Sequence, residues 1–402
     1  MSFRAKFSHM TQRLAHTGPD LWKVHTDAQL RLASGEDIIM MSVGDPDLAT
    51  IERIIEHAVT SLYRGRTHYS PGMGELNLRQ TIADIETQAS GKVTTPDEVI
   101  IFPGATNAVF SVLSCLLNPL DELIVVEPAY VGYQPIFRAI GAKIATVSAR
   151  SDENFAVNSQ EIEDAVTSNT RALLLNTPGN PAGNMMPGNQ LGHLAKFCLD
   201  NDIWLICDEV YSMITYEKKH ISARTAAASL ENVIVIDGLS KSHAMTGWRL
   251  GWTVAPVNVI EKLLGFTSAT VFGCSQFIQD AAAFALQNDG EYILSITREY
   301  RSRRDYACDR VDRIKGLSCQ KPEAGMFLMI DVSAIAESGL EFARDLLHKE
   351  GVSVLPGEGF GRTTSRFIRL SLTHSVDGLE KAFDRIERFV SSAGKGVGKG
   401  PG

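Results

Sequence analysis

Five short apolar runs in the middle of the chain constrain its fold more than any other feature. They lie at residues 99–102, 122–126, 172–175, 203–207 and 233–236. The runs lack the alternation of polar and apolar residues that marks a strand with one wet face, which indicates strands buried on both faces. Helical patterns at residues 106–117, 133–140 and 191–200 separate several of them. The sequence therefore predicts an α/β domain with a mainly parallel sheet flanked by helices.

The pattern changes from about residue 292 onward. A charged helix is expected at residues 299–314, followed by strands at 326–330 and 366–372 and an amphipathic helix at 378–390. This order predicts a smaller α+β domain. We expect a large domain of residues 47–290, a small domain of residues 1–46 with 291–392, and a Gly- and Lys-rich disordered tail at 393–402.

Composition excludes several classes of function. The 402 residues carry a formal net charge of −8, which counts against nucleic-acid binding. No run approaches the ~20 apolar residues of a membrane span, so no membrane association is expected. The six cysteines are scattered without a Cys-x-x-Cys pair, which indicates no metal site and favours a reducing, cytoplasmic compartment.

Polar or glycine-rich residues follow each of the five apolar runs. They are Gly104-Ala105, Glu127 to Tyr130, Asn176 to Asn180, Asp208, and Ser240-Lys241. Ligands of parallel sheets bind outside the carboxyl ends of the strands, so these residues are expected to meet in one site.

The run from Asp237 to Trp252 is the most informative of these segments. Lys241 follows an apolar strand, Ser240 comes directly before it, and Arg249 lies eight residues after it. A lysine that forms a Schiff base needs a rigid strand end, and a phosphorylated cofactor needs hydroxyl and guanidinium groups nearby. The alternative is a surface lysine in a turn. The glycines among bulky tryptophans of this run argue against it, because they indicate closely packed backbone.

Other strand ends offer matching chemistry. A carboxylate near the interior, such as Asp208, needs a cationic partner, and a protonated pyridine nitrogen would be one. The simpler interpretation of Asp208 is a helix N-cap. Asn180, in a turn-rich loop, and Tyr211 could both reach a phenolate oxygen on a cofactor ring. Tyr130 offers an aromatic face for stacking, although alone it would be read as a packing tyrosine.

Ala105 and Thr106 open a helix directly after the first strand. The free N–H groups and the dipole of a helix N-terminus favour phosphate. Taken alone this signal is weak, and its value lies in its position beside the other strand ends.

These motifs together resemble the class I/II aminotransferases, the pyridoxal-phosphate enzymes of fold type I. The likeness rests on residues 238–252, Asn180-Pro181-Ala182-Gly183, Asp208-Glu209-Val210-Tyr211, and Arg369 within residues 367–371, in the family's order. It extends from about Thr11 to Phe389. The likeness implies an α/β fold type I transferase that uses pyridoxal 5'-phosphate.

The resemblance also implies roles for single residues. Lys241 would hold the cofactor and move protons, and Asp208 would pair with the pyridine nitrogen. Asn180 and Tyr211 would bind the ring oxygen. The remaining cofactor contacts implied are Tyr130 on the ring, and Ala105, Thr106, Ser240 and Arg249 at the phosphate.

The family pattern extends to substrate and partner. Arg369 would bind the substrate α-carboxylate, and Gly44 and Asn180 would lie against the substrate. Tyr69 matches a tyrosine that reaches the phosphate of the neighbouring subunit, which implies a homodimer with shared active sites.

Two departures bear on the chemistry. Gly238 stands where the family often has serine or asparagine, so Ser240 alone supplies a nearby hydroxyl. Thr106 stands where aspartate-using members carry a lysine, which weakens an aspartate specificity.

A closer likeness is to bacterial arginine–pyruvate transaminases, carried by residues 11–14, 21–25, 42–47, 240–249, 351–355 and 357–361. It predicts ping-pong transamination from arginine, or a similar basic amino acid, to pyruvate. A guanidinium-binding carboxylate is expected, with Asp20 and Asp27 as candidates.

Three alternatives remain at this point. The first is an aspartate or aromatic aminotransferase, and the second is a pyridoxal-phosphate-dependent C–S β-lyase. The third is a regulatory protein with an aminotransferase-like domain, for which the sequence leaves no room for a basic helix-turn-helix segment before residue 11.

Overall fold

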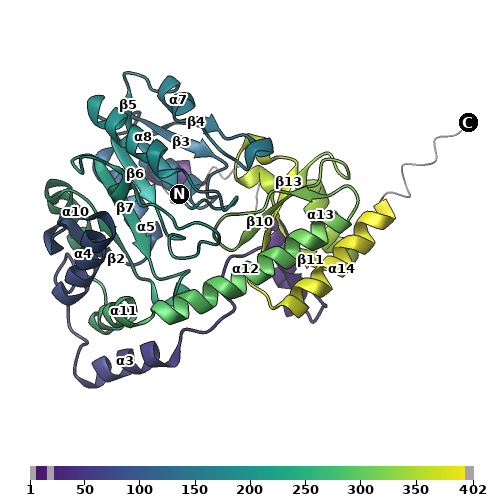
Figure 1. Ribbon diagram of the computed structural model, residues 1–402, viewed down its shortest axis with the longest axis horizontal. Coiled ribbons are helices and arrows are strands. Elements are labelled where there is room, and N and C mark those ends of the chain that lie inside the picture. Colours follow the sequence, from purple (N-terminus) through teal and green to yellow (C-terminus); the bar gives the residue numbers. More distant parts are fainter. Residues whose placement is uncertain (1–5, 16–21, 394–402) are drawn as a thin grey trace, which may run out of the picture.

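A seven-stranded sheet forms the centre of the chain in the computed structural model, which describes residues 6–15 and 22–393 (Figure 1). In spatial order its strands are β2 (Val99–Phe102), β8 (Gly251–Val254), β7 (Val233–Gly238), β6 (Trp204–Asp208), β5 (Thr170–Asn176), β3 (Glu122–Glu127) and β4 (Lys143–Ser148). Only β8 runs antiparallel to its neighbours. The predicted mainly parallel sheet is confirmed, and all five apolar runs are strands in it.

Two strands of this sheet were not apparent in the sequence. β4 is an edge strand whose residues are mostly exposed or half-buried, so it lacks an apolar run. β8 begins at Gly251, inside the lysine segment. A Cβ atom at Gly251 would come within 2.5 Å of the backbone nitrogen of Ala105. The close approach of two backbones there requires glycine, and the glycine hides the strand from pattern analysis.

Helices cover both faces of the sheet. One face packs against α5 (Ala105–Leu116), α6 (Tyr133–Ile140) and α10 (Val257–Thr270). The other packs against α7 (Ser159–Asp164), α8 (Gly188–Asp200) and α9 (Ala223–Ala226). A further cluster joins β2 and β8 to α3 (Glu52–Tyr63), α4 (Leu76–Ser90) and α11 (Gln276–Asn288). The strands lie between helical layers, as buried runs require.

The smaller domain has a four-stranded antiparallel sheet in the order β12 (Leu355–Pro356), β13 (Phe367–Ser371), β10 (Phe327–Asp331) and β9 (Ser318–Cys319). It packs with α2 (Lys23–Ala33), α12 (Gly290–Arg313), α13 (Gly339–Glu350) and α14 (Val376–Ala393). In Figure 1, α12 runs from beside α11 to this domain. It begins nine residues before the predicted start, with Glu291 in a first turn that favours acidic side chains.

The N-terminal segment joins the smaller domain through a parallel pair of two-residue strands. β1 (Ile39–Met40) pairs with β11 (Val352–Ser353). The exact domain boundaries stay a prediction. Ala393 ends α14, and the rest of the predicted tail lies outside the described residues.

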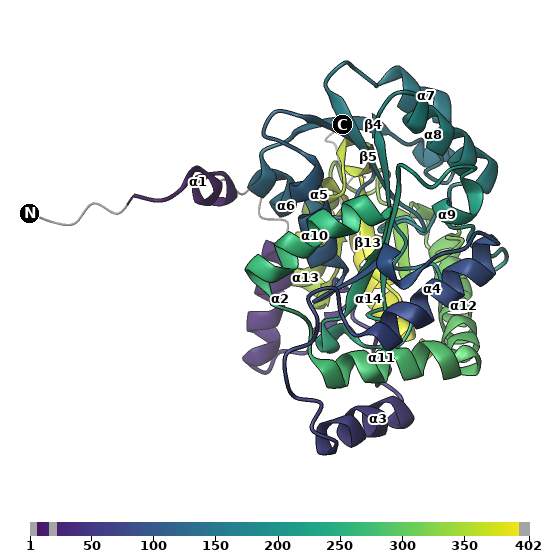
Figure 2. The ribbon, with the colours of Figure 1, turned by 90° about the vertical axis from the view of Figure 1, so that its left-hand side faces the viewer.

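Helix α1 (His9–Ala15) lies beside α6, away from the rest of the N-terminal segment (Figure 2). Arg13 donates to the carbonyl oxygens of Arg138 and Ala139, both at 2.6 Å. These bonds satisfy carbonyl groups at the last turn of α6 that have no partner within the helix. Within the described residues, no helix is long and apolar enough to cross a membrane.

Short 3₁₀ helices fill several connections. They are η1 (Pro96–Glu98), η2 (Ser151–Glu153), η3 (Thr246–Trp248), η4 (Gly357–Gly359) and η5 (Arg362–Thr364).

His243 is buried in the loop that follows β7. Its side chain is 1% exposed, and its Nδ1 lies 2.8 Å from Oγ of Ser242. Burial lowers the pKa of His243 from 6.5 to about 4. The unfolded chain therefore binds a proton as pH falls below 6.5, while the folded chain stays neutral there. The stability that the neutral imidazole contributes is complete above pH 6.5 and is lost as pH falls toward 4.

We predict that His243→Gln loses less stability on acidification than the native protein, because glutamine has no proton to gain. The difference between pH 7 and pH 4 should approach about 3 kcal/mol, at 1.36 kcal/mol per unit of pKa shift. Denaturant unfolding at several pH values measures it. His348→Gln, at an exposed position on α13, serves as the control. Equal acid sensitivity of native protein and His243→Gln would contradict the argument.

Candidate active site

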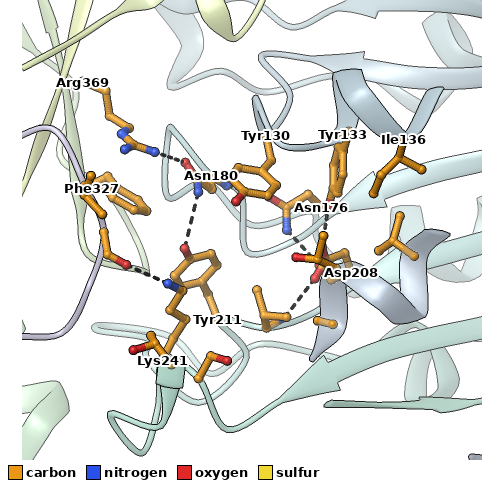
Figure 3. Close-up of a pocket in the computed structure, with 18 of the residues that line it drawn as sticks. Tyr130, Tyr133, Ile136, Asn176, Asn180, Asp208, Tyr211, Lys241, Phe327 and Arg369 are labelled. Atoms are coloured by element: carbon orange, nitrogen blue, oxygen red, sulfur yellow. Dashed lines mark hydrogen bonds between the residues drawn. The ribbon is translucent and has the colours of Figure 1, made fainter. Parts of the chain in front are cut away.

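A cavity of about 280 Å³ lies where the carboxyl ends of the central strands face the smaller domain (Figure 3). Its walls combine aromatic rings, amides and charged groups from both domains. The lining residues are Trp22, Val43, Gly44, Ala105, Thr106, Val109, Tyr130, Tyr133, Ile136, Asn176, Asn180, Asp208, Val210, Tyr211, Ser240, Lys241, Thr246, Arg249, Phe327 and Arg369. The expected convergence of the strand ends is therefore present.

Eleven of the twelve site residues expected from the sequence line this cavity. They are Gly44, Ala105, Thr106, Tyr130, Asn180, Asp208, Tyr211, Ser240, Lys241, Arg249 and Arg369. The twelfth, Tyr69, is 81% exposed and lines a separate surface hollow, where its ring meets the edge of Phe272. Tyr69 does not reach the cavity of its own chain.

Asp27, one of the two carboxylates expected to bind a guanidinium, is not part of the cavity lining. Asp27 lies in another hollow, with Lys23, Arg344 and His348. Its position follows from helix geometry, because Asp27 is two residues beyond His25, which faces Ser42, and two residues turn a helix by about 200°. Asp20 lies outside the described residues.

Asp208 ends β6 in the middle of the sheet and is 5% exposed. Tyr133 donates its hydroxyl to Oδ2 of Asp208 at 2.5 Å, and Asn176 Nδ2 donates to the Asp208 carbonyl oxygen at 3.0 Å. Burial raises the pKa of Asp208 to about 6, partly opposed by the bonds from Tyr133 and the Val210 N–H. None of the groups that most affect this pKa is a cation. A protonated pyridine nitrogen would supply the missing positive charge.

Asn180 connects three parts of the site. Its Nδ2 lies 3.4 Å from the hydroxyl oxygen of Tyr211, and its Oδ1 accepts from Nη1 of Arg369 at 2.9 Å. Its backbone N–H donates to Oδ1 of Asn176 at 2.7 Å, which fixes the loop. Burial raises the pKa of Tyr211, so its phenol stays protonated and can donate a hydrogen bond. The Asn180 amide and the Tyr211 phenol are thus two donors close together, as a ring oxygen needs.

Lys241 lies three residues after β7, and its Nζ donates to the carbonyl oxygen of Gly44 at 2.6 Å. Burial lowers the pKa of the Lys241 amine to about 8, although Asp45 acts in the opposite direction. Gly44 must be glycine, since a Cβ atom there would lie 2.2 Å from the ring of Phe327. An amine with this pKa is neutral in a useful fraction of molecules near neutral pH, as a nucleophile or base requires.

The N-terminus of α5 forms a cradle beside Arg249. Gly104 precedes the helix with φ of +91°, and a Cβ atom there would meet Nη2 of Arg249 at 2.4 Å. The first N–H groups of the helix, at Ala105 and Thr106, have no acceptor within the helix. Ser240 lines the same cavity. A helix N-terminus with a guanidinium and a hydroxyl at hand suits a phosphate group.

Arg369, on β13, is 2% exposed, and its guanidinium lies over the ring of Phe327 at 4.0 Å. Besides its bond to Asn180, Nη2 donates to the Ser42 carbonyl oxygen at 2.7 Å. Nε has no hydrogen-bond partner although it is buried. Burial lowers the pKa of Arg369 to about 10, so it remains a cation at neutral pH. It can therefore pair with an incoming carboxylate.

Several residues of the site were not expected from the sequence. Tyr133, Ile136 and Phe327 looked like ordinary core residues of a helix and a strand, and Trp22 stood in a polar N-terminal segment. Tyr133 could have been predicted from the sequence, because it lies about one helical turn after Tyr130, which follows the end of β3. Among the described residues, no cluster of His, Cys, Asp and Glu could hold a metal ion.

Pyridoxal phosphate fits this set of groups. Asp208 has a buried carboxylate in need of a cation, and Lys241 an amine of lowered pKa. The helix N-terminus at Ala105 and Thr106, with Arg249 beside it, offers donors for the phosphate.

Comparison with known proteins supports the inference that the site holds pyridoxal phosphate. The family model for aminotransferase class I and II matches residues 36–386. Arginine–pyruvate transaminase AruH of Pseudomonas aeruginosa is 39% identical over 381 residues, which is 95% of this chain and 97% of that protein. An aspartate aminotransferase of Bacillus subtilis is 32% identical over 89% of this chain and 92% of that protein.

Among solved structures, a double mutant of aspartate aminotransferase from Thermus thermophilus superposes with a TM-score of 0.91 at 30% identity, covering 96% of this chain and 100% of that one. Sequence, fold and site therefore agree that the chain belongs to the class I and II aminotransferases and is a pyridoxal-phosphate-dependent enzyme of fold type I.

Proposed function

We propose that this aminotransferase transfers the amino group of arginine, or of a similar basic amino acid, to pyruvate in two half-reactions. The observation that carries the proposal is the 39% identity to an arginine–pyruvate transaminase over 95% of the chain. Thr106 on the cavity wall supports it, because no lysine is available there for the second carboxylate of aspartate. Aspartate aminotransferases are also similar to this chain, so the donor is the part that needs testing.

The proposed roles combine the family likeness with the positions of these residues on the cavity wall. Asp208 would hold the pyridine nitrogen, Asn180 and Tyr211 the ring oxygen, and Tyr130 the ring face. The phosphate contacts would be Ala105, Thr106, Ser240 and Arg249. When bound, the cofactor acts as an electron sink and carries the amino group between the half-reactions.

The chain's own groups would do the rest of the work. Arg369, aided by Asn180, would bind the substrate α-carboxylate as a charge-assisted pair. Gly44 would lie against the substrate, and its carbonyl oxygen accepts from the Lys241 amine, which holds that amine at the cavity wall. The Lys241 amine would take the α-proton from the bound amino acid and return a proton to the product side, as its pKa of about 8 permits.

We also propose a homodimer with shared active sites, in which Tyr69 completes the phosphate site of the partner. The 81% exposure of Tyr69 and the 60% exposure of the adjacent Phe272 support this, because two exposed aromatic residues together favour an interface. The cysteine pattern favours a cytoplasmic location.

Replacing Lys241 by alanine should lower turnover by at least about 10³-fold, since the site loses both its covalent attachment point and its general base. The visible absorbance of the covalently held cofactor should disappear as well. Lys218→Ala, at a lysine whose side chain is 79% exposed, serves as the control. Normal turnover by Lys241→Ala would refute the assignment.

Tyr133→Phe should lower the catalytic efficiency because it changes the ionisation of Asp208. The Tyr133 bond lowers the pKa of Asp208, so its loss leaves the carboxylate less ionised near neutral pH. We expect kcat/KM to fall about 10- to 100-fold, as for a lost bond to a charged group, and the acid limb of its pH profile to move to higher pH. Tyr63→Phe, with a side chain 89% exposed, is the control. An unshifted acid limb would count against this role.

Competition among amino donors tests the substrate. With pyruvate as acceptor, kcat/KM for arginine should exceed that for aspartate and tyrosine by at least about 10-fold. A higher value for either rival would overturn the arginine proposal and leave the family membership intact. Release of pyruvate from a cysteine conjugate without an acceptor would instead identify a β-lyase.

A further inference from the structure

The cavity contains a feature that bears on how a basic side chain is recognised, if the proposed function holds. Its described walls carry three cationic residues, Lys241, Arg249 and Arg369, against one acidic residue, Asp208. Asp208 is buried at the sheet end, bonded to Tyr133, and is the proposed partner of the cofactor. The described walls therefore hold no spare carboxylate for a guanidinium.

Aromatic rings are the alternative means of binding a cation. Five of them line the cavity, and four have other roles. Tyr133 donates to Asp208, and Phe327 lies against Arg369. Tyr130 is the proposed stacking partner of the cofactor ring, and Tyr211, whose hydroxyl lies beside Asn180, is a proposed donor to the ring oxygen. The fifth ring, Trp22, is 40% exposed and comes from the start of α2 in the N-terminal segment. Indole is also the best aromatic partner for a cation.

Trp22 is held in place by its neighbours. Its carbonyl oxygen accepts from the Thr26 N–H at 2.7 Å, which fixes the backbone. Its ring meets that of His25 edge-on, with centroids 5.6 Å apart. Nδ1 of His25 lies 2.8 Å from Oγ of Ser42, and the Ser42 carbonyl oxygen accepts from Arg369 at 2.7 Å.

The same short chain of contacts thus orients the proposed carboxylate anchor and the Trp22 ring. An amino acid held by Arg369 at one end would direct its side chain away from that anchor. Its length then decides whether its far end reaches Trp22. We propose that Trp22 is the specificity-determining residue for the donor, binding the guanidinium of a long basic side chain on its indole face.

One carboxylate competes with this assignment. Asp45 is exposed, accepts from the hydroxyl of Thr246 at 2.7 Å, and acts electrostatically on Lys241. It is outside the cavity lining but near its rim, where Thr246 stands. The two residues make different predictions, because the preference for a charged end group is lost on removing the Trp22 ring if the indole binds the cation, and on neutralising Asp45 if the carboxylate does.

The test compares arginine with citrulline, which has the same length and shape but a neutral end group. Native enzyme, Trp22→Leu, Trp22→Phe, Asp45→Asn and Asp27→Asn are assayed with each donor, and the ratio of the two kcat/KM values isolates the charge. Trp22→Leu should lower this ratio about 3- to 30-fold, the range of a partly desolvated cation–π contact. Trp22→Phe should retain most of it, and Asp27→Asn should match the native enzyme.

A binding measurement complements the kinetics. In the Lys241→Ala background, calorimetric titration with arginine and citrulline should show the same loss of preference when Trp22→Leu is added. An unchanged ratio in Trp22→Leu would overturn the inference, and so would a loss of preference in Asp45→Asn alone. Failure of the native enzyme to use arginine would instead refute the proposed function, and this is seen before any variant is made.

Discussion

The burial of one carboxylate, that of Asp208, is the constraint on which the rest of the site depends. An isolated charge is costly to bury, and burial raises the Asp208 pKa to about 6. The protein limits this cost with the Tyr133 hydroxyl from α6 and the Val210 N–H, which donate to the carboxylate. The Asn176 amide from β5 donates to the Asp208 backbone carbonyl oxygen, so two elements are fixed relative to β6. No cation is among the groups that most affect this pKa, and the proposed pairing with the pyridine nitrogen of the cofactor would supply one. On that proposal, the fold holds a buried carboxylate whose charge the bound cofactor would balance.

Much of the site could be predicted from the sequence because parallel strands end at one edge. Lys241, Asp208 and Asn180 each follow an apolar run, and no tertiary information was needed to expect them together. Tyr133 and Phe327 escaped for a physical reason. A buried aromatic residue in a regular element has the same local pattern whether it faces the core or a cavity. Their roles come from contacts between segments far apart in the chain.

The fold, like the site, was predicted in some parts and missed in others. Strands buried on both faces were recognised from their apolar runs, whereas β4 lies at a partly exposed edge and β8 begins with a glycine required by close backbone contact. The early start of α12 was missed because its first turns place apolar residues at both exposed and buried positions, such as Leu294 (63% exposed) and Ile296 (2% exposed), and so lack a clear amphipathic pattern. Asp27 was a reasonable carboxylate candidate by position, but the turn of α2 directs it elsewhere. The local sequence pattern predicts well whether a residue is buried. It predicts which neighbouring segment a helical side chain faces only when the packing of the helix is known.

The pairing of β1 with β11 has a consequence for how the chain is made. The two strands are separated by more than 300 residues. During synthesis, every strand of the central sheet leaves the ribosome before the partner of β1 exists. The large sheet can therefore form first, while the N-terminal segment waits unpaired with its apolar residues in contact with solvent or chaperones. Since Ser42 lies two residues after β1, its contact with Arg369, the proposed carboxylate anchor, forms only after nearly the whole chain has been translated.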